Sequence, residues 1–439
     1  MGGRFSRHSF RPSLRKFERL VIYLAEQPIS IAYLANQFPS SVEPYVCDEI
    51  AALRRQGFTV LPCSARRTSK NLVDERQKTF AAETLYLEPL RIGLLGRALW
   101  LCVRERQRLS GLLRRILGRG RENPSRRVRA LLHTWLGAYY ALRLQERGIR
   151  HIHVHHGYFS SWIAMVAALS LEIKFSMTLH GSDLLLHGAY LDLKLKHSAF
   201  CLTVSDFNRN YVLQHYVDVD PGKVIVQRIG VAAAHVRTSD FPRDWSQPFT
   251  ILAVGRLHAI KDHAFLVRAC RQLKDRGFNF ECLIAGEGPE RRSLEGLIQT
   301  LHMKGNVNLL GHIAHPQLDT LYATCDLVVL TSRSEGIPLV LMEAMARKAS
   351  VLAPAITGIP ELVFDGRTGF LYQPGSLEDF VESVVNISQL GSALKPVREA
   401  ARSHVISHFD REKNLSTLAD LFRQRLQTTE KSYADPLLQ

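Results

Sequence analysis

Short apolar runs alternate with longer amphipathic segments over most of the chain, and the order of these segments predicts the fold. Residues 29–35 and 58–61 are short apolar runs of the kind that forms buried strands. Between them, residues 45–56 repeat apolar side chains at helical spacing, and Gly57 follows as a typical C-terminal residue of a helix. Strand, helix and strand in this order form a βαβ unit, so we expect a parallel sheet.

The alternation continues to residue 230, is lost over residues 233–248 and begins again at residue 250. Further strands are expected at residues 152–154, 175–179, 201–204, 224–230, 250–254, 280–285, 307–310, 327–330 and 350–353. We therefore predict an α/β protein with two Rossmann-like domains. Their limits are residues 20–232 and 249–405, with a basic disordered extension (1–19), a linker (233–248) and a C-terminal helix with a mobile tail (406–439).

The formal net charge of +16 is concentrated in one segment. Residues 91–150 hold fifteen arginines and three glutamates, and residues 91–147 predict two helices separated by Gly118, Gly120 and Pro124. In the first helix the spacing predicts one apolar stripe, formed by Leu95, Leu99, Cys102, Leu109 and Leu113. We interpret these helices as an anionic-membrane-facing patch, since basic side chains are attracted to anionic lipid and Trp100 can enter the interface. A nucleic-acid surface and a solvated helix face are the alternatives. No aromatic stacking platform accompanies the arginines, so nucleic acid is not an expected partner.

Other features of the composition bear on location. The chain has no run of 18 uninterrupted apolar residues, and its first twenty residues lack the apolar core of a signal peptide. The seven cysteines are scattered and form no C-x-x-C pair, as expected for free thiols in a reducing compartment. We expect a cytoplasmic protein, peripheral on the cytoplasmic face of the inner membrane. The pattern does not indicate an oligomeric state.

Two glutamates eight residues apart, Glu335 and Glu343, carry the strongest chemical signal. Glu335 lies in a polar turn after the strand at residues 327–330, and Glu343 lies on the helix that Gly336 and Pro338 begin. The backbone N–H groups at Gly336 and Ile337 then form an anion site at the helix N-terminus. Amides that bind phosphate, flanked by two carboxylates that bind hydroxyl groups, suit a sugar nucleotide.

A second motif follows the strand at residues 250–254. Gly255 allows a close backbone turn, and Arg256 and Lys261 then lie at the carboxyl end of a parallel strand, where α/β sheets bind ligands. The glycines after residue 285 are not a dinucleotide fingerprint, because Arg291 stands where a third glycine is needed. This argues against an NAD-dependent oxidoreductase.

These motifs together resemble the retaining glycosyltransferases of the GT-B fold, in particular glycosyltransferase family 4. The resemblance implies two Rossmann-like domains facing a cleft, a nucleotide-diphosphate sugar as co-substrate, and no metal or other cofactor. It implies that Glu335 contacts the donor sugar, that Glu343 holds the ribose, and that Arg256 and Lys261 bind the diphosphate. Ile337 stands where many members have an aromatic residue.

The resemblance extends to further segments. The turn at Gly286 is expected to border the nucleotide, and Ile313 lies in the segment that meets the base. His180, which ends the strand at residues 175–179, is expected to face the donor sugar across the cleft. Asp183 is expected to orient this loop on the acceptor side.

The turn containing Ser41 and Glu43 is similar to the acceptor-side turn of members that assemble bacterial exopolysaccharide and envelope glycans. Val42 and Pro44 depart from that pattern, which bears on the acceptor more than on the fold. The implied acceptor is a glycan, or a glycan linked to a lipid.

Two patterns favour a metal when taken alone. Four imidazoles lie on or beside one predicted strand, at His151, His153, His155 and His156. This run resembles a His-x-His strand of the family, however, and no carboxylate lies nearby in the sequence. Asp218 and Asp220 resemble a metal-binding pair of a different glycosyltransferase fold, but Pro221 places them in a loop. We therefore expect no metal.

The predicted reaction is transfer of a sugar to a glycan hydroxyl with retention of configuration, in which the leaving phosphate helps to take the acceptor proton. One alternative is a catalytically inactive, membrane-associated carbohydrate-binding or scaffold protein on the same fold. A sugar-phosphate phosphorylase is a second alternative, but it requires a pyridoxal phosphate lysine for which the sequence shows no motif.

Overall fold

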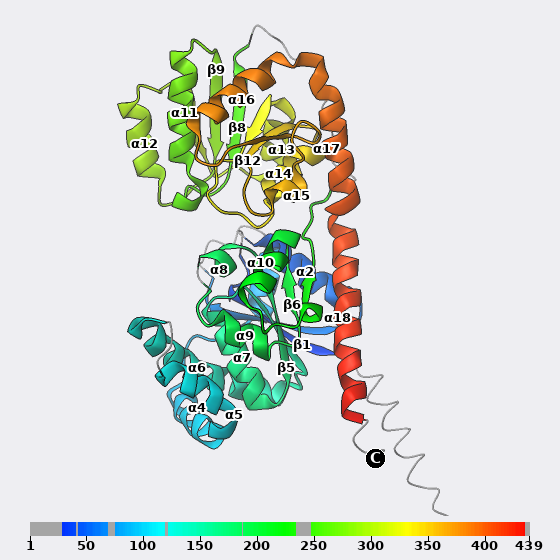
Figure 1. Cartoon of the computed structure of the whole chain (residues 1–439). Coiled ribbons are helices and arrows are strands. Elements are labelled where there is room, and N and C mark those ends of the chain that lie inside the picture. The colour runs from blue at the N-terminus through cyan, green and yellow to red at the C-terminus, as the bar shows by residue number, and fades with distance from the viewer. Residues whose placement is uncertain are drawn as a thin grey trace, which may run out of the picture.

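The computed structural model describes residues 29–40, 43–68, 75–118, 122–186, 188–233 and 247–434, except for the side chains of His315 and residues 428–434. Most of these residues form two parallel sheets with helices packed around them (Figure 1). The predicted basic extension and most of the predicted linker, residues 234–246, lie outside the described residues.

The first sheet has seven strands in the order β3-β2-β1-β4-β5-β6-β7. Its strands are β1 (Ser30–Gln37), β2 (Thr59–Arg66), β3 (Leu85–Tyr86), β4 (His151–His155), β5 (Lys174–Leu179), β6 (Cys201–Thr203) and β7 (Val224–Val226). The helices of this N-terminal unit are α2 (Pro44–Arg55), α3 (Glu75–Glu83), α4 (Ile92–Arg104), α5 (Arg106–Leu117), α6 (Pro124–Leu144), α7 (Phe159–Leu171), α8 (Ser182–Leu185), α9 (Leu191–His197) and α10 (Asp206–His215).

The second sheet has six strands in the order β10-β9-β8-β11-β12-β13. Its strands are β8 (Phe249–Val254), β9 (Phe280–Ala285), β10 (Val307–Gly311), β11 (Leu327–Val329), β12 (Ser350–Pro354) and β13 (Phe370–Tyr372). The helices of this C-terminal unit are α11 (His263–Asp275), α12 (Arg291–Thr300), α13 (His315–Thr324), α14 (Leu339–Ala346), α15 (Ile359–Leu362), α16 (Leu377–Gln389) and α17 (Leu394–His408), and α18 (Arg411–Ala434) ends the described chain.

The strand predictions are confirmed for β1, β2 and β4 to β12, which pair in parallel throughout. Continuous apolar runs identified them because strands covered on both faces need no polar side. The strands β3 and β13 were missed, since two or three residues are too few to show a period. The C-terminal residue predicted for the first helix, Gly57, has the expected left-handed backbone with φ +89°.

The prediction of two helices within residues 91–147 is wrong, because the first of them is divided into α4 and α5. The break falls at Glu105, a buried carboxylate that forms ion pairs with Arg104 and Arg108. It changes the helical phase, so Leu109 faces the core while Leu99, expected on the same stripe, is 58% exposed. Among the described residues, no helix combines the length and the apolar character needed to cross a membrane.

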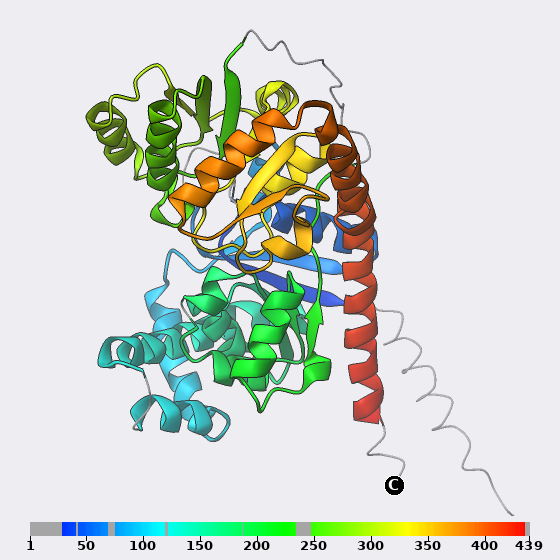
Figure 2. The same cartoon turned by 45° about the horizontal axis from the view of Figure 1, so that its top comes forward.

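The last helix returns to the N-terminal unit. After α17 packs on the C-terminal unit, α18 runs along the first sheet beside α2, as both views show (Figures 1 and 2). Phe422 is fully buried there, edge-on to Phe200 at 5.5 Å between ring centroids and near Tyr33. Arg411 at the start of α18 pairs with Asp48 of α2 at 3.3 Å. One helix thus completes the core of a domain from which it is remote in sequence.

A carboxylate of the C-terminal unit also joins the two units. Glu361 of α15 accepts hydrogen bonds from the first amides of α10, from Asp206 N at 2.9 Å and Phe207 N at 2.7 Å. These amides have no partner within their own helix, and an anion there is favoured by the helix dipole. Arg228 lies beside the same carboxylate at 3.3 Å. The contact lies beyond the carboxyl ends of β6 and β12, so these ends of the two sheets face each other.

Replacing Phe422 by alanine is expected to lower the free energy of unfolding by about 3–5 kcal/mol, because a fully buried aromatic ring leaves a cavity. Urea denaturation would measure the change. Gln427→Ala, at an exposed position of the same helix, is the control and should differ from the parent by less than about 0.5 kcal/mol. Equal stability of the two variants would contradict the packing of α18.

Candidate active site

The structure brings Lys261 and Glu335 into direct contact. The Lys261 ammonium lies 2.6 Å from Glu335 Oε1, and both side chains are partly buried. Their loops are joined by two hydrogen bonds, from Thr331 Oγ1 to Lys261 O at 2.9 Å and from Arg333 N to Ile260 O at 2.8 Å. The two residues were predicted from separate motifs, and the neighbouring strands β8 and β11 place them side by side.

The turn after Glu335 lies against the N-terminal unit. A Cβ atom added at Gly336 would lie 2.0 Å from the carbonyl oxygen of His180, and one added at Gly181 would lie 3.1 Å from Gly336 N. Only glycine allows this approach, and Gly181 also has φ +148°. Neither Gly336 N nor Ile337 N donates a hydrogen bond to another described residue. The expected anion-binding amides therefore lie beside the loop of His180.

Glu343 lies on α14, as predicted, and Pro338 is the N-cap residue of that helix. Glu343 Oε2 accepts a hydrogen bond from the Tyr322 hydroxyl at 3.0 Å. Burial, followed by the charge of Glu343, raises the pKa of Tyr322 well above its usual value. Ile337, by contrast, is buried in the core of the C-terminal unit.

Gly255 and Gly286 form a second close backbone contact. A Cβ atom at Gly286, where φ is +155°, would lie 1.9 Å from Gly255 O. The loops after β8 and β9 therefore touch, which explains the glycine at position 286. Ile313, after β10, is partly buried against the core of the C-terminal unit.

Arg256 is exposed at the carboxyl end of β8 and forms no ion pair with a residue that the structure describes. Burial raises the pKa of Tyr158, and the charge of Arg256 is among the smaller influences that oppose this shift. Arg256 thus lies close enough to the N-terminal unit to affect a residue there. It is positioned to contact a negatively charged group between the units.

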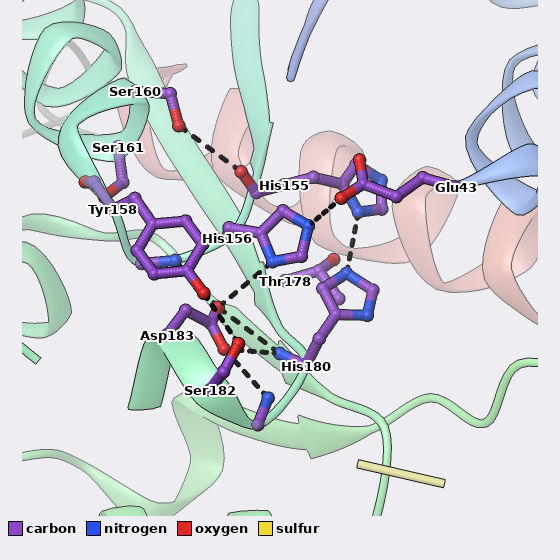
Figure 3. A network of polar contacts seen from close by, with 12 residues as sticks. Glu43, His155, His156, Tyr158, Ser160, Ser161, Thr178, His180, Ser182 and Asp183 are labelled. Atoms are coloured by element: carbon purple, nitrogen blue, oxygen red, sulfur yellow. Dashed lines mark hydrogen bonds and ion pairs between the residues drawn. The ribbon is translucent and has the colours of Figure 1, made fainter. Parts of the chain in front are cut away.

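His180 ends a chain of buried polar groups (Figure 3). His155 Nδ1 lies 2.9 Å from His180 Nε2, and His155 Nε2 lies 2.9 Å from Glu49 Oε2. The Tyr33 hydroxyl donates to the same carboxylate oxygen. An ionised carboxylate only accepts, so His155 donates to it from Nε2. If Nδ1 of His155 then accepts from His180 Nε2, the free nitrogen of His180 is Nδ1, an acceptor.

Figure 3 also shows which way the free ring nitrogen of His180 points. In Figure 3 the second ring nitrogen of His180 points away from His155 and from the network. Burial, with smaller contributions from His156 and His155, lowers the pKa of His180 well below its usual value, so the ring is neutral. The site thus offers a neutral imidazole with a lone pair available to a hydroxyl donor.

A second group of buried charges holds the loop itself. Asp183, fully buried, accepts hydrogen bonds from Gly157 N and Gly181 N at 2.8 Å and from His180 N at 3.1 Å. His156 lies between this carboxylate, 3.6 Å away, and Glu43, 2.8 Å away. Burial lowers the pKa of His156, but the two carboxylates outweigh it and raise that pKa to about 10. The charged ring fixes the loop that carries His180.

The three residues predicted on the acceptor side do not share one position in the structure. Asp183 lies behind the loop, as expected of a residue that orients it, and Glu43 is paired with His156. Ser41 lies outside the described residues. The backbone of His156 is left-handed, with φ +69°, a conformation that is unfavourable for a residue with a side chain and is concentrated at functional sites.

The histidines considered as metal ligands have hydrogen-bond partners from protein groups. His151 Nε2 and His153 Nδ1 lie 2.7 and 2.8 Å from the Ser176 hydroxyl, and His153 Nε2 lies 3.0 Å from the Thr178 hydroxyl. Within the part of the chain that the structure describes, no three His, Cys, Asp or Glu side chains are grouped as metal ligands.

Three residues of this region were missed at the sequence level. Glu49 stands among the buried positions of α2, and a carboxylate on an apolar helix face was a detectable signal. His155 was noticed only as a possible metal ligand. Glu361 had no local signal, because the amides that it binds belong to the other unit.

Comparison with known proteins gives a family for part of the chain. Residues 238–404 match the family described as glycosyl transferases group 1. The chain is 32% identical over 211 residues to the putative colanic acid biosynthesis glycosyltransferase WcaL of Escherichia coli (strain K12), covering 46% of this chain and 51% of the relative. It is 31% identical over 184 residues to the amylovoran biosynthesis glycosyltransferase AmsK of Erwinia amylovora, covering 40% and 45%. The chain spans about half the length of these curated relatives.

Solved structures resemble nearly the whole chain. A sucrose-phosphate synthase from Thermosynechococcus elongatus has a TM-score of 0.70 at 18% identity, covering 91% of this chain and 100% of the other. Anabaena HepE in complex with UDP has a TM-score of 0.64 at 17% identity, covering 90% and 100%. At these identities the likeness concerns the fold. Residues 238–404 thus match the group 1 glycosyl transferases, and the two parallel-sheet units have the GT-B fold.

Proposed function

We propose that the protein is a retaining glycosyltransferase that moves a sugar from a nucleotide-diphosphate sugar to a hydroxyl group of a glycan. The observation that carries this proposal is the convergence of Lys261, Glu335 and the Gly336 turn on the loop of His180. Cation, carboxylate, free amides and a neutral imidazole acceptor meet between two units, where GT-B enzymes bind their donors.

Each group has a role in holding the donor. Arg256 and Lys261 bind the diphosphate, and the amides of Gly336 and Ile337 add hydrogen bonds to it. A diphosphate competes with Glu335 for the Lys261 ammonium, which leaves the carboxylate to accept from sugar hydroxyls. Glu343 accepts from the ribose. The HepE structures contain UDP and UDP-glucose, which supports a nucleotide sugar as donor here.

In the proposed reaction the bond between the anomeric carbon and the diphosphate oxygen breaks as the bond to the acceptor oxygen forms on the same face. The acceptor proton passes to the leaving diphosphate oxygen. Negative charge grows on the diphosphate in the transition state, and Arg256 and Lys261 stabilise it without a metal ion. His180 Nδ1 accepts a hydrogen bond from a hydroxyl of the donor sugar and holds the sugar in place.

The relatives that act in colanic acid and amylovoran biosynthesis support a role in exopolysaccharide or envelope glycan synthesis with a lipid-linked acceptor. The outer helices support a membrane location on the cytoplasmic face. On α4, Ile92, Leu99, Trp100 and Val103 are exposed by 87%, 58%, 61% and 56%. Arg91, Arg97 and other arginines surround them, so the surface suits the interface of an anionic membrane.

Replacing Glu335 is expected to impair sugar transfer, whereas replacing Glu343 is expected to impair nucleotide binding. Glu335→Ala should lower kcat/KM for transfer by about 10² to 10³, because an electrostatic contact to the reacting sugar is lost. Its nucleotide affinity should stay within about threefold of the parent value, whereas Glu343→Ala should weaken binding about tenfold or more through loss of the ribose contact. Radiolabelled transfer assays and calorimetry with UDP, GDP and ADP would measure both effects.

Glu295→Gln, an exposed glutamate on α12, is the control and should match the parent in both assays. Full transfer activity in Glu335→Ala would contradict the assigned role. Nucleotide binding without transfer from any donor tried would favour the inactive scaffold alternative.

Glu49 should act on His180 through its capacity to accept hydrogen bonds rather than through its charge. Both bonds to Glu49 end on one oxygen, which an amide oxygen can replace, so Glu49→Gln should keep kcat/KM within about threefold. Glu49→Leu removes the acceptor, frees the tautomer of His155 and His180, and should lower kcat/KM about tenfold, the equivalent of one hydrogen bond. Nitrogen-15 NMR of the His180 ring reports the tautomer directly. An unchanged tautomer and kcat/KM in Glu49→Leu would leave Glu49 a purely structural role.

Membrane binding should depend on the exposed face of α4. The protein should sediment with vesicles of phosphatidylcholine and phosphatidylglycerol, and less with phosphatidylcholine alone or at high salt. Replacing Trp100 and Val103 together by alanine should weaken binding about tenfold or more, since both side chains lose apolar contact with lipid. Replacing Val217 and Ile406, which are exposed elsewhere, should leave binding unchanged. Equal binding by both double variants would exclude α4 as the membrane face.

A further inference from the structure

A large cavity in the N-terminal unit takes no part in holding the donor. Its volume is about 720 Å³, and it lies between α6 and the carboxyl ends of β1, β2 and β4. Asn36 and Arg66 contribute from strand ends, Arg126 and Arg129 from α6, and Tyr190 from the loop before α9. Its size suits a ligand larger than a single sugar.

The cavity carries positive charge that is not neutralised by ion pairs. Arg66, Arg126 and Arg129 form no ion pair with any residue that the structure describes, and Glu88 is the acidic residue in the lining. Neighbouring arginines differ, since Arg115 pairs with Glu122 at 2.7 Å. Three guanidinium groups that face one cavity repel one another, an arrangement that is favourable once an anion binds.

Two further titratable groups line the cavity. Burial, followed by the charges of Lys194 and Arg129, lowers the pKa of His133 to about 4, so its ring adds no charge. Burial also lowers the pKa of Lys194 to about 7, against the opposing charges of Asp183 and Asp192, and its side-chain nitrogen donates to Gly157 O at 2.7 Å and Tyr158 O at 3.1 Å. Even without His133, therefore, the lining is cationic.

The remaining lining is apolar and continues to the protein surface. Leu87, Leu136, Phe159 and Trp162 form part of the wall. Leu132 also lines the cavity and is 47% exposed, and Val128 and Leu131 on the same helix are exposed by 66% and 37%. An apolar path therefore leads from the cationic cavity to exposed side chains of α6, beside the helices with the proposed membrane face.

The cavity and the donor site share a wall. Gly157 and Tyr158 line the cavity, Gly157 N donates to Asp183, and the Tyr158 hydroxyl is hydrogen-bonded to Ser182 at 2.6 Å. Both contacts belong to the network that holds the loop of His180 (Figure 3). A molecule bound in the cavity lies next to the proposed site of transfer.

We propose that this cavity binds the acceptor through a phosphate or diphosphate group held by Arg66, Arg126 and Arg129. The acceptor is then an anionic amphiphile, whose hydrocarbon part follows Leu132 toward the membrane and whose glycan hydroxyl extends toward His180. The role as acceptor rests on the proposed function, but recognition of an anion in this cavity does not.

Calorimetry with three probes tests the proposal: decyl diphosphate, inorganic pyrophosphate and decyl maltoside. Decyl diphosphate should bind, and replacing Arg126 and Arg129 together by glutamine should weaken it on the order of 100-fold, through loss of two charge-assisted bonds. Replacing Arg292 and Arg367 by glutamine removes the same charge from exposed positions on the C-terminal unit, outside the cavity, and should change affinity less than about threefold. Folding of each variant is checked by its melting temperature.

The other arms separate the sources of affinity. With UDP present to fill the proposed donor site, pyrophosphate binding that is weaker than that of decyl diphosphate, and weakened further in the cavity variant, supports recognition of both phosphate and hydrocarbon. Equal affinity for the two would overturn the hydrocarbon part, and equal or tighter binding of decyl maltoside would overturn the phosphate part. If both arginine variants weaken decyl diphosphate binding equally, the loss of affinity reflects net charge and not the cavity. The affinity of the same variants for UDP should equal that of the parent. Absence of UDP binding in the parent protein would therefore count against the proposed donor site and not against the cavity.

Discussion

The approach of two backbones at Gly336 and His180 limits how the two units of this protein can meet. A single methyl group at Gly336 would overlap the carbonyl oxygen of His180. The turn that carries Glu335 and the loop that carries His180 can therefore lie together only because Gly336 and Gly181, the residue after His180, have no side chains. The contact brings the groups proposed to bind the donor beside the imidazole of the other unit, and Glu361 at the N-terminus of α10 supports the same arrangement from a neighbouring loop.

The loop of His180 is fixed by charges that are themselves buried. Asp183 gathers three backbone amides, and the His156 imidazolium balances Asp183 and Glu43. With a folded-state pKa of about 10, above the usual value near 6.5, His156 stabilises the fold fully below the lower value, and this stabilisation is lost as pH rises through the higher one. The glycine that follows His156 also lines the arginine-rich cavity, so one rigid loop serves both sites.

Much of the fold was predictable because its strands are local, continuous apolar runs. The position of Glu335 and Lys261 at neighbouring strand ends was also predictable, since parallel strands end at one edge of a sheet. The division between α4 and α5 was not, because a leucine stripe remains plausible until Glu105 interrupts its phase. The support of His180 by His155 and Glu49 depends on contacts between β4, β5 and α2, and 106 positions separate Glu49 from His155. No local pattern reports such a contact.

The course of α18 has a consequence for biosynthesis. Its apolar face covers Tyr33 and Phe200, which are made long before Phe422 leaves the ribosome. The N-terminal unit therefore cannot complete its core while it is being translated, although its sheet is the first to emerge. The C-terminal unit must be synthesised before that core can close.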